Sequence, residues 1–386
     1  MNTGGAADIR ISFTLSSTTD IGTLRVFIVE AAQAAAFDTE AAQGTSAGRF
    51  QEIAPQGATL FLDGGTLTAA GNAVAEGTAY QLFILSVNDG TNRADALSSG
   101  SPSIALAKTD LVLTLVDNLA AGTGPVAVGP DGMIYVADSG PVPNLLGTVI
   151  HRFDAAGNSE IFADDPALTS PLGGAFDSNG LLHWASLTNS SVLRIAADGS
   201  ISTFATEGIL APLGIAFDAS DTLFVANCGD GSVQKVAPDG TSSQLVINAL
   251  LNCPNGIVVG PDDNIYVSNF NDGNIARVTR GGSVSLFATV PGASNGKIDY
   301  RDGLFYVAGR GAHRIYTVDM SGTVSAIAGS GSQGFADGTA TSASMSLPNG
   351  IAFNGDGSRL YFTQGRTTSG LNNTPTQVRY ISFEAP

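Results

Sequence analysis

Three asparagines, Asn255, Asn295 and Asn349, each stand directly before a glycine in a short phrase that the chain repeats. Their amide oxygens could bind a polar ligand or a hard cation. Asn before Gly also favours a tight turn in which the side chain bonds its own backbone, and this structural interpretation stays open. No carboxylate accompanies the amides at equivalent positions, although Ca²⁺ prefers negatively charged oxygen. Amides alone would therefore hold such a cation weakly.

Charged residues follow the second of these asparagines. Lys297 and Asp299 stand where other copies of the phrase carry apolar residues, and side chains two positions apart in a strand share a face. They could take part in catalysis, or they could neutralise each other as an ion pair packed between sheets. Arg310 and His313 come later in the same repeat and complete the set of candidate catalytic residues. Lys297 and Arg310 would recognise an anionic group or a lactone carbonyl.

Cys228 and Cys253 are the only cysteines, and an isolated pair can close one bridge. Cys228 follows the second strand of one repeat, and Cys253 directly precedes the repeated phrase of the next. The strand order predicted below brings both to one face in adjacent repeats, so we expect a disulfide, with two free thiols as the alternative. A disulfide would indicate an oxidising, extracytoplasmic compartment.

Charge and motif content limit the possible partners. The formal net charge is −17, and such a surface repels nucleic acid and anionic lipid. No apolar run approaches the length of a membrane span. The three histidines are not expected to form a zinc site, and neither a Gly-x-Ser-x-Gly phrase nor a phosphate loop is present. The expected partner is a small molecule, a glycan or a protein, bound by a monomer.

An internal repeat must position these residues. The phrase Pro-Leu-Gly-Ile-Ala-Phe begins at Pro212, and Pro-Asn-Gly-Ile-Val-Val begins 42 residues later at Pro254. Related phrases begin at Thr123, Pro171, Ser294 and Pro348, which makes six copies. Each copy continues as short strands with period-2 patterning, joined by turn dipeptides such as Asp239-Gly240. Four antiparallel strands per repeat predict a propeller blade, so the sequence predicts six blades.

The two ends of the repeat region predict how the ring closes. The copy from Pro348 lacks a fourth strand, and an orphan strand, 111–116, precedes the first copy. We expect this strand to complete the last blade, since the pairing removes an exposed edge and gives a propeller over residues 109–386. Residues 1–108 lack the repeat, and their candidate strands are typical of an immunoglobulin or fibronectin type III-like β-sandwich. The predicted fold class is all-β.

Loop length nominates one face of the propeller as its working surface. The loops that precede each innermost strand and those that join second to third strands share this face, and they include the long segments 138–147, 329–347 and 364–376. The second residue of each repeated phrase should lie at the channel mouth there. These residues are Gly124, Leu172, Leu213, Asn255, Asn295 and Asn349.

Several phrases resemble those of known propeller families. Asn-Gly-Ile-Ala-Phe from Asn349 and Asp-Gly-Met-Ile-Tyr-Val from Asp131 resemble NHL repeats, and residues 109–386 are also similar to the gluconolactonase and regucalcin superfamily and to virginiamycin B lyase-like propellers. Asn-Gly-Lys-Ile-Asp from Asn295 is similar to a gluconolactonase phrase. The resemblance implies a divalent cation, Ca²⁺ above all, at Asn255, Asn295 and Asn349. It implies no single function, because these families include lactonases, lyases and pure binding modules.

Two functions remain open. The first is an extracytoplasmic bacterial propeller, periplasmic or secreted and freed of a signal peptide, that recognises a ligand or partner at the loop-rich channel mouth. The alternative is a metal-assisted lactonase, hydrolase or lyase, whose cation polarises a carbonyl group. The absence of carboxylates among the amides favours recognition, whereas Lys297 and Asp299 beside Asn295 favour the enzyme. Whether the protein is an enzyme stays open at this point.

Overall fold

The chain divides into two compact units, one within Met1–Thr109 and one at Asp110–Phe383. The computed structural model describes residues 110–119, 123–140, 146–365 and 376–383 of the larger unit. In the smaller unit it describes the backbone of residues 9–12, 21–30, 51–53, 59–62, 68–69, 72–73, 79–88, 96–97 and 104–105. No helix in this described part of the chain is long and apolar enough to cross a membrane.

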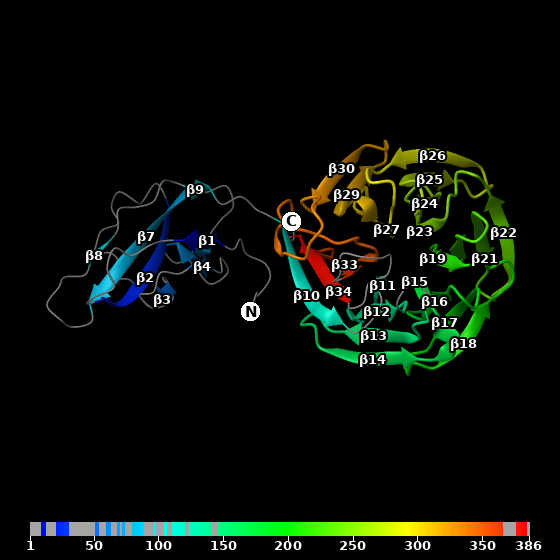
Figure 1. Ribbon diagram of the computed structural model, residues 1–386, viewed down its shortest axis with the longest axis horizontal. Coiled ribbons are helices and arrows are strands. Elements are labelled where there is room, and N and C mark those ends of the chain that lie inside the picture. Colours follow the sequence, from blue (N-terminus) through cyan, green and yellow to red (C-terminus); the bar gives the residue numbers. More distant parts are fainter. Residues whose placement is uncertain are drawn as a thin grey trace. The chain divides into compact units, whose positions relative to one another are not determined.

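The larger unit is a six-bladed β-propeller, so the predicted all-β fold is confirmed (Figure 1). Blades 1 to 5 are four-stranded sheets of consecutive antiparallel strands, with the first strand at the axis and the fourth at the rim.

The strands of these five blades follow one another in the sequence. Blade 1 contains β11 (Thr123–Val128), β12 (Ile134–Asp138), β13 (Val149–Phe153) and β14 (Ser159–Asp164). Blade 2 contains β15 (Pro171–Phe176), β16 (Leu182–Ser186), β17 (Ser191–Ile195) and β18 (Ile201–Ala205). Blade 3 contains β19 (Pro212–Phe217), β20 (Leu223–Asn227), β21 (Ser232–Val236) and β22 (Ser242–Ile247). Blade 4 contains β23 (Pro254–Val259), β24 (Ile265–Asn269), β25 (Asn274–Val278) and β26 (Val284–Thr289). Blade 5 contains β27 (Ile298–Arg301), β28 (Leu304–Gly309), β29 (Arg314–Asp319) and β30 (Val324–Ala328).

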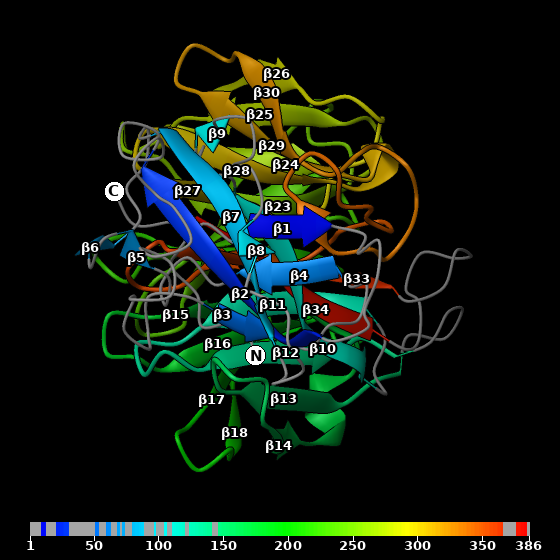
Figure 2. The ribbon, with the colours of Figure 1, turned by 90° about the vertical axis from the view of Figure 1, so that its left-hand side faces the viewer.

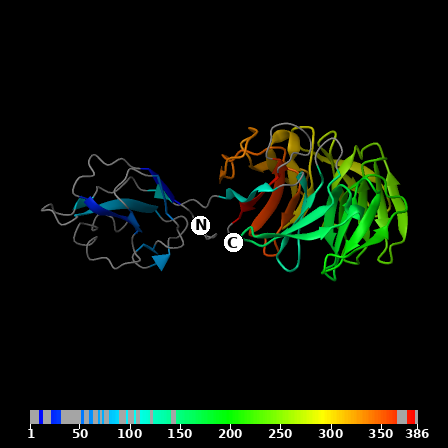
Figure 3. The same ribbon diagram turned by 60° about the horizontal axis from the view of Figure 1, so that its bottom comes forward.

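Blade 6 combines strands from both ends of the larger unit. It contains β32 (Ile351–Phe353), β33 (Arg359–Gly365), β34 (Thr376–Ser382) and β10 (Leu111–Leu119), with the short β31 (Gly338–Thr339) at the outer edge. β10 pairs antiparallel with β34, with Leu113 opposite Tyr380. The turquoise strand therefore lies beside the red one in Figures 1 and 3. Val112 and Ile381 are fully buried in this sheet, so an apolar core supports the closure.

The glycines of the repeated phrase allow the innermost strands to approach one another at the axis. A Cβ on Gly214 would lie 2.5 Å from the carbonyl oxygen of Asn255 in the next blade, and a Cβ on Gly296 would lie 2.4 Å from that of Asn349. Both distances are too short for real carbon–oxygen contacts, so only glycine fits there without a shift of the neighbouring strand. The close approach brings backbone carbonyl groups near the axis.

Aromatic rings fill the space between neighbouring blades. Tyr266 on β24 contacts Phe287 and Phe305, with ring centroids 4.8 and 4.2 Å apart. His183 takes the equivalent place on β16 and packs edge-on against Phe204 and Phe217. Burial lowers the pKa of His183, so the neutral ring is favoured there. His183 is 1% exposed and is therefore a core residue.

The smaller unit contains β-strands in more than one sheet. β2 (Ile21–Glu30) and β7 (Ala79–Asn88) pair antiparallel and lie side by side in Figure 2. The remaining strands are β1 (Ile9–Ser12), β3 (Gln51–Ile53), β4 (Thr59–Leu62), β5 (Thr68–Ala69), β6 (Asn72–Ala73), β8 (Ala96–Leu97) and β9 (Ile104–Ala105). β3, β8 and β9 flank the central pair, while β1 pairs β4 and β5 pairs β6. Much of the predicted sandwich falls outside the described residues, so the fibronectin type III-like assignment stays a prediction.

Candidate functional site

The three nominated asparagines lie where the innermost strands meet, but all three are covered. Asn255, Asn295 and Asn349 expose 4%, 0% and 5% of their surface, respectively. Because the strands approach so closely at the axis, the side chains are enclosed between blades instead of standing open at a channel mouth. The channel itself narrows to an internal space of about 60 Å³.

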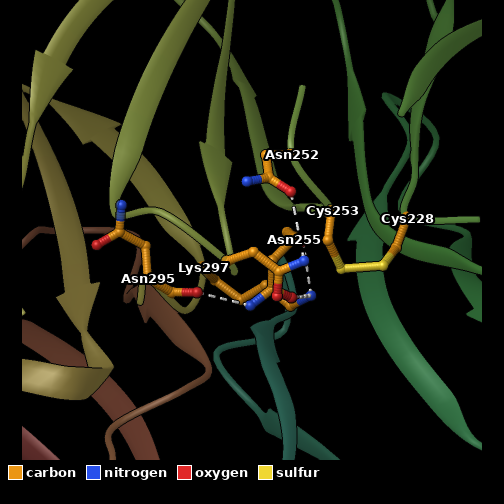
Figure 4. Close-up of a disulfide and its surroundings, with 7 residues drawn as sticks. Cys228, Asn252, Cys253, Asn255, Asn295 and Lys297 are labelled. Carbon is orange, nitrogen blue, oxygen red and sulfur yellow. Dashed lines mark hydrogen bonds between the residues drawn. A yellow bond between two sulfur atoms is a disulfide. The ribbon is translucent and has the colours of Figure 1, made fainter. Parts of the chain in front are cut away.

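The amine of Lys297 lies in a cage of three oxygen atoms (Figure 4). It donates to the carbonyl oxygen of Leu213 at 2.6 Å, and to the carbonyl oxygen and Oδ1 of Asn255 at 2.8 Å each. Three acceptors match the three N–H groups of an ammonium, whereas a neutral amine has only two. Leu213 belongs to blade 3 and Asn255 to blade 4, so Lys297 joins three consecutive blades.

Opposing effects act on the charge of Lys297. Burial, followed by the positive charge of Arg310, lowers its pKa well below the ordinary value for lysine. The three oxygens that accept its hydrogen bonds favour the charged form. A buried cation without such partners would strongly destabilise the fold, so Lys297 can be buried at the axis only because the three oxygens accept its hydrogen bonds.

Asn255 has a further bond that links it to Asn295. Its Nδ2 donates to the carbonyl oxygen of Asn295 at 2.9 Å, so both ends of the Asn255 amide are engaged. The amide of Asn295 points away from Lys297 in Figure 4, and neither of its polar atoms has a partner in the described part of the chain. Asn349 takes part through its backbone, whose carbonyl oxygen accepts from the Lys297 amide nitrogen at 2.8 Å.

The ion pair considered for Lys297 and Asp299 is wrong. Asp299 accepts from the backbone nitrogen of Tyr300 at 2.8 Å and from that of Phe353 at 3.1 Å. Phe353 belongs to β32, so Asp299 connects blade 5 to blade 6, while Lys297 lies before β27 and extends toward blades 3 and 4. Burial raises the pKa of Asp299. The sequence spacing could not reveal that the two side chains diverge.

Arg310 and His313 both contact Leu347, two residues before Asn349. Arg310 begins a short 3₁₀ turn (Arg310–Ala312), and its Nη1 donates to the Leu347 carbonyl at 3.4 Å. Its guanidinium lies over the ring of Phe270, 5.5 Å from the centroid, and burial lowers its pKa to about 10. His313 Nδ1 accepts from the Leu347 backbone nitrogen at 3.2 Å. Burial, and then the charge of Arg310, lowers the pKa of His313, which favours the neutral ring.

The residues at the axis do not fit a divalent cation. Asn255 already uses both its carbonyl oxygen and its Oδ1 to accept from Lys297, and a second positive charge at these oxygens would face that ammonium at close range. The amides also bring no carboxylate, the ligand that Ca²⁺ prefers. In the part of the chain that the structure describes, no group of three or more His, Cys, Asp or Glu side chains could hold a metal ion.

An open depression of about 490 Å³ lies beside the expected disulfide, which is present between Cys228 and Cys253. The depression is on the loop face, defined as the face formed by the segments before each innermost strand and between second and third strands. It lies where blades 3 and 4 meet. Asp230, Asn252 and Asn271 contribute polar groups to its wall. These three residues were not among the candidates predicted from the sequence, although Asp230 and Asp272 recur 42 positions apart in equivalent loops.

Comparison with known proteins relates this arrangement to other propellers. No protein-family model matches the chain, and no curated protein sequence matches it. Solved structures do. An auxiliary nutrient binding protein from Bacteroides ovatus has 13% identity and a TM-score of 0.59, with 98% of this chain and 94% of that one covered. A gluconolactonase from Xanthomonas campestris has 16% identity and a TM-score of 0.54, covering 70% and 89%.

The virginiamycin B lyase from Staphylococcus aureus has 16% identity and a TM-score of 0.50, covering 80% of this chain and 92% of that one. The likeness is one of fold. At these identities it carries no residue roles across, and propellers with one architecture serve different functions. The function must therefore be argued from the residues at the axis and on the loop face.

Proposed function

We propose that this protein is an extracytoplasmic recognition module that binds a small molecule, a glycan or a protein on the loop face of its propeller. The observation that carries this proposal is the position of the Lys297 ammonium within its three-oxygen cage. The resemblance implies a cation at Asn255, Asn295 and Asn349, and here Asn255 is engaged by the ammonium of Lys297. Among the residues that the structure describes, the depression beside the disulfide offers an open surface to a ligand.

Compartment and charge support the same function. The Cys228–Cys253 disulfide favours an oxidising compartment, such as the periplasm or the exterior of the cell. A net charge of −17 disfavours nucleic acid and anionic membranes as partners. We propose a monomer that meets its ligand through the loop face.

The alternative is a metal-assisted lactonase, hydrolase or lyase. The fold likeness to the Xanthomonas campestris gluconolactonase and the Staphylococcus aureus lyase is its support. Such an enzyme would need a cation, most simply Ca²⁺, at Asn255, Asn295 and Asn349. That cation would have to displace Lys297 from Asn255, and no carboxylate would compensate its charge. The recognition function is therefore favoured.

The melting temperature of chelator-treated protein distinguishes the recognition module from the metal-assisted enzyme. It is measured with Ca²⁺, Mg²⁺, Mn²⁺ and Zn²⁺ in turn, for the wild type, for Asn255→Ala and for the control Asn179→Ala in an exposed turn of blade 2. Hydrolysis of γ- and δ-lactones is followed under the same conditions. We expect no cation-specific stabilisation that depends on Asn255, and no lactone turnover. Stabilisation and turnover that Asn255→Ala alone abolishes would establish the metal enzyme instead.

A further inference from the structure

The depression between blades 3 and 4 contains a carboxylate oxygen that no described residue satisfies. Asp230 Oδ1 is shielded from solvent and has no hydrogen-bond partner in the described part of the chain. Asp272, in the equivalent loop of the next blade, accepts from Asn269 Nδ2 at 3.2 Å and from the Asn274 backbone nitrogen at 2.9 Å. A shielded acceptor atom without a donor is destabilising. Asp230 as a residue is only partly buried and lines the depression, so its carboxylate can meet a donor from outside the chain there.

Amide groups surround this acceptor. Asn252 and Asn271 are exposed on the wall of the depression. Asn271 Nδ2 donates to Asn252 Oδ1 at 3.4 Å, and the Asn271 backbone nitrogen donates to the Asn252 carbonyl oxygen at 3.4 Å. Asn248 uses its Oδ1 to accept from the Leu250 backbone nitrogen at 2.9 Å. The Nδ2 groups of Asn248 and Asn252 have no acceptor among the residues described. The wall thus combines one carboxylate acceptor with unused amide donors.

The wall is held in place from several directions. The Cys228–Cys253 disulfide joins the loop after β20 to the segment before β23. Asn269 Nδ2 donates to the carbonyl oxygen of Leu250 at 2.8 Å, which fixes the middle of the segment between β22 and β23. A site that is already ordered loses less conformational entropy when it binds a ligand.

These groups select a chemical class of ligand. A hydroxyl group can donate to a carboxylate and accept from an amide, so several hydroxyls on one small molecule would satisfy both kinds of group. No lysine or arginine lines the described depression to attract an anion, and a single carboxylate is too little for Ca²⁺. Ile247, which is 54% exposed, offers an apolar contact for the carbon face of a ring.

We propose that this depression binds a neutral polyhydroxylated ligand, such as a sugar, with Asp230 as the acceptor for its hydroxyl groups. The inference rests on the proposed recognition function and names the ligand class for it. It assigns the ligand to the loop face where blades 3 and 4 meet, and not to the axis, where Lys297 and the three asparagines lie.

The test is binding of defined sugars to the full chain. Saturation-transfer NMR and calorimetric titration use glucose, galactose, N-acetylglucosamine, maltose and cellobiose, with glucuronate as the anionic comparison. Asp230→Asn keeps the side-chain size and removes the charge, and Asn252→Ala removes one donor. Asp239→Asn is the matched control, because Asp239 caps a hairpin of the same blade on the opposite face. Melting temperatures report whether each variant folds.

We expect at least one neutral sugar to bind, and Asp230→Asn to weaken that binding by about tenfold or more, as loss of a hydrogen bond to a charged group predicts. Asn252→Ala should weaken it less, Asp239→Asn should leave it unchanged, and glucuronate should not bind. If a sugar binds equally well to wild type and Asp230→Asn, the assignment to this depression is overturned while recognition elsewhere stands. If no sugar binds, the ligand class is overturned. The recognition function itself fails on a separate result, Asn255-dependent lactone turnover with a cation.

Discussion

The Nζ of Lys297 lies 2.8 Å from both the Oδ1 and the carbonyl oxygen of Asn255, so a lysine of blade 5 donates two hydrogen bonds to an asparagine of blade 4 at the propeller axis. The carbonyl of Leu213 in blade 3 completes the cage at 2.6 Å. Close packing of the innermost strands turns these oxygens toward the axis, and an internal ammonium satisfies them. The residues at the axis thereby support the structure of the ring, and under the proposed function the ligand binds on the loop face.

Removing this ammonium should destabilise the propeller. Lys297→Met keeps much of the side-chain volume but leaves three buried oxygens without their donor, and the relief of lysine desolvation offsets only part of that loss. We expect a decrease of about 2–4 kcal/mol in the free energy of unfolding, measured by urea denaturation. Lys235→Met is the control, because Lys235 is exposed on β21. Equal stability of the two variants would contradict the structural role of the cage.

The disulfide should stabilise the ring and the depression together. Cys228 and Cys253 are 25 residues apart, and closing a loop of that length removes enough chain entropy to be worth about 3–4 kcal/mol. The double variant Cys228→Ser, Cys253→Ser should lose that amount in chemical denaturation, and a reductant should lower the wild-type melting temperature without affecting the variant. A wild type that is insensitive to reductant although its disulfide is reduced would contradict this prediction.

Stability should fall in mild acid, and His183 should account for part of the loss. Burial lowers its folded pKa below the unfolded value of about 6.5, so its contribution is present above that pH and is lost as the pH falls toward the folded pKa. His183→Phe restores the aromatic type found at Phe224 and Tyr266. Between pH 7.5 and pH 5 this variant should lose less unfolding free energy than the wild type, measured by urea denaturation at both pH values. An identical loss in both proteins would show that His183 titrates normally.

The repeated glycine should tolerate no side chain. In Gly214→Ala the new Cβ would lie 2.5 Å from the Asn255 carbonyl oxygen, so the innermost strands must separate and the Lys297 cage must distort. We expect a loss of about 1–3 kcal/mol in unfolding free energy. Gly355→Ala is the matched control, because its Cβ would meet nothing within 4 Å, and it should be neutral or slightly stabilising. A harmless Gly214→Ala would refute close packing at the axis.

The blade architecture could be predicted because its signals are local and repeated. The phrase at Pro212 and its copy at Pro254 identify innermost strands, and the turn dipeptides identify hairpins. The cysteine pairing followed from the same register, since the strand order places Cys228 and Cys253 on one face. Each of these inferences needed only sequence spacing and the geometry of an ideal blade.

The site was less predictable because it depends on contacts between different blades. The bonds of Lys297 reach Leu213, 84 residues away, and no spacing within one repeat indicates that pairing. The burial of Asn295 depends on how closely the six innermost strands pack at the axis. The amino-acid composition does not predict that spacing. Asp230 became a candidate only because its oxygen lacks the internal donors that Asp272 has in the equivalent loop.

The structural role of Lys297 is tested most directly by a high-resolution crystal structure of protein soaked in Mn²⁺, with anomalous differences measured at the manganese edge. We expect the density of Lys297 to reach Asn255 and Leu213, with no anomalous peak at the axis. An anomalous peak bonded to Asn255 Oδ1, with Lys297 displaced from its cage, would refute that role and favour a metal centre.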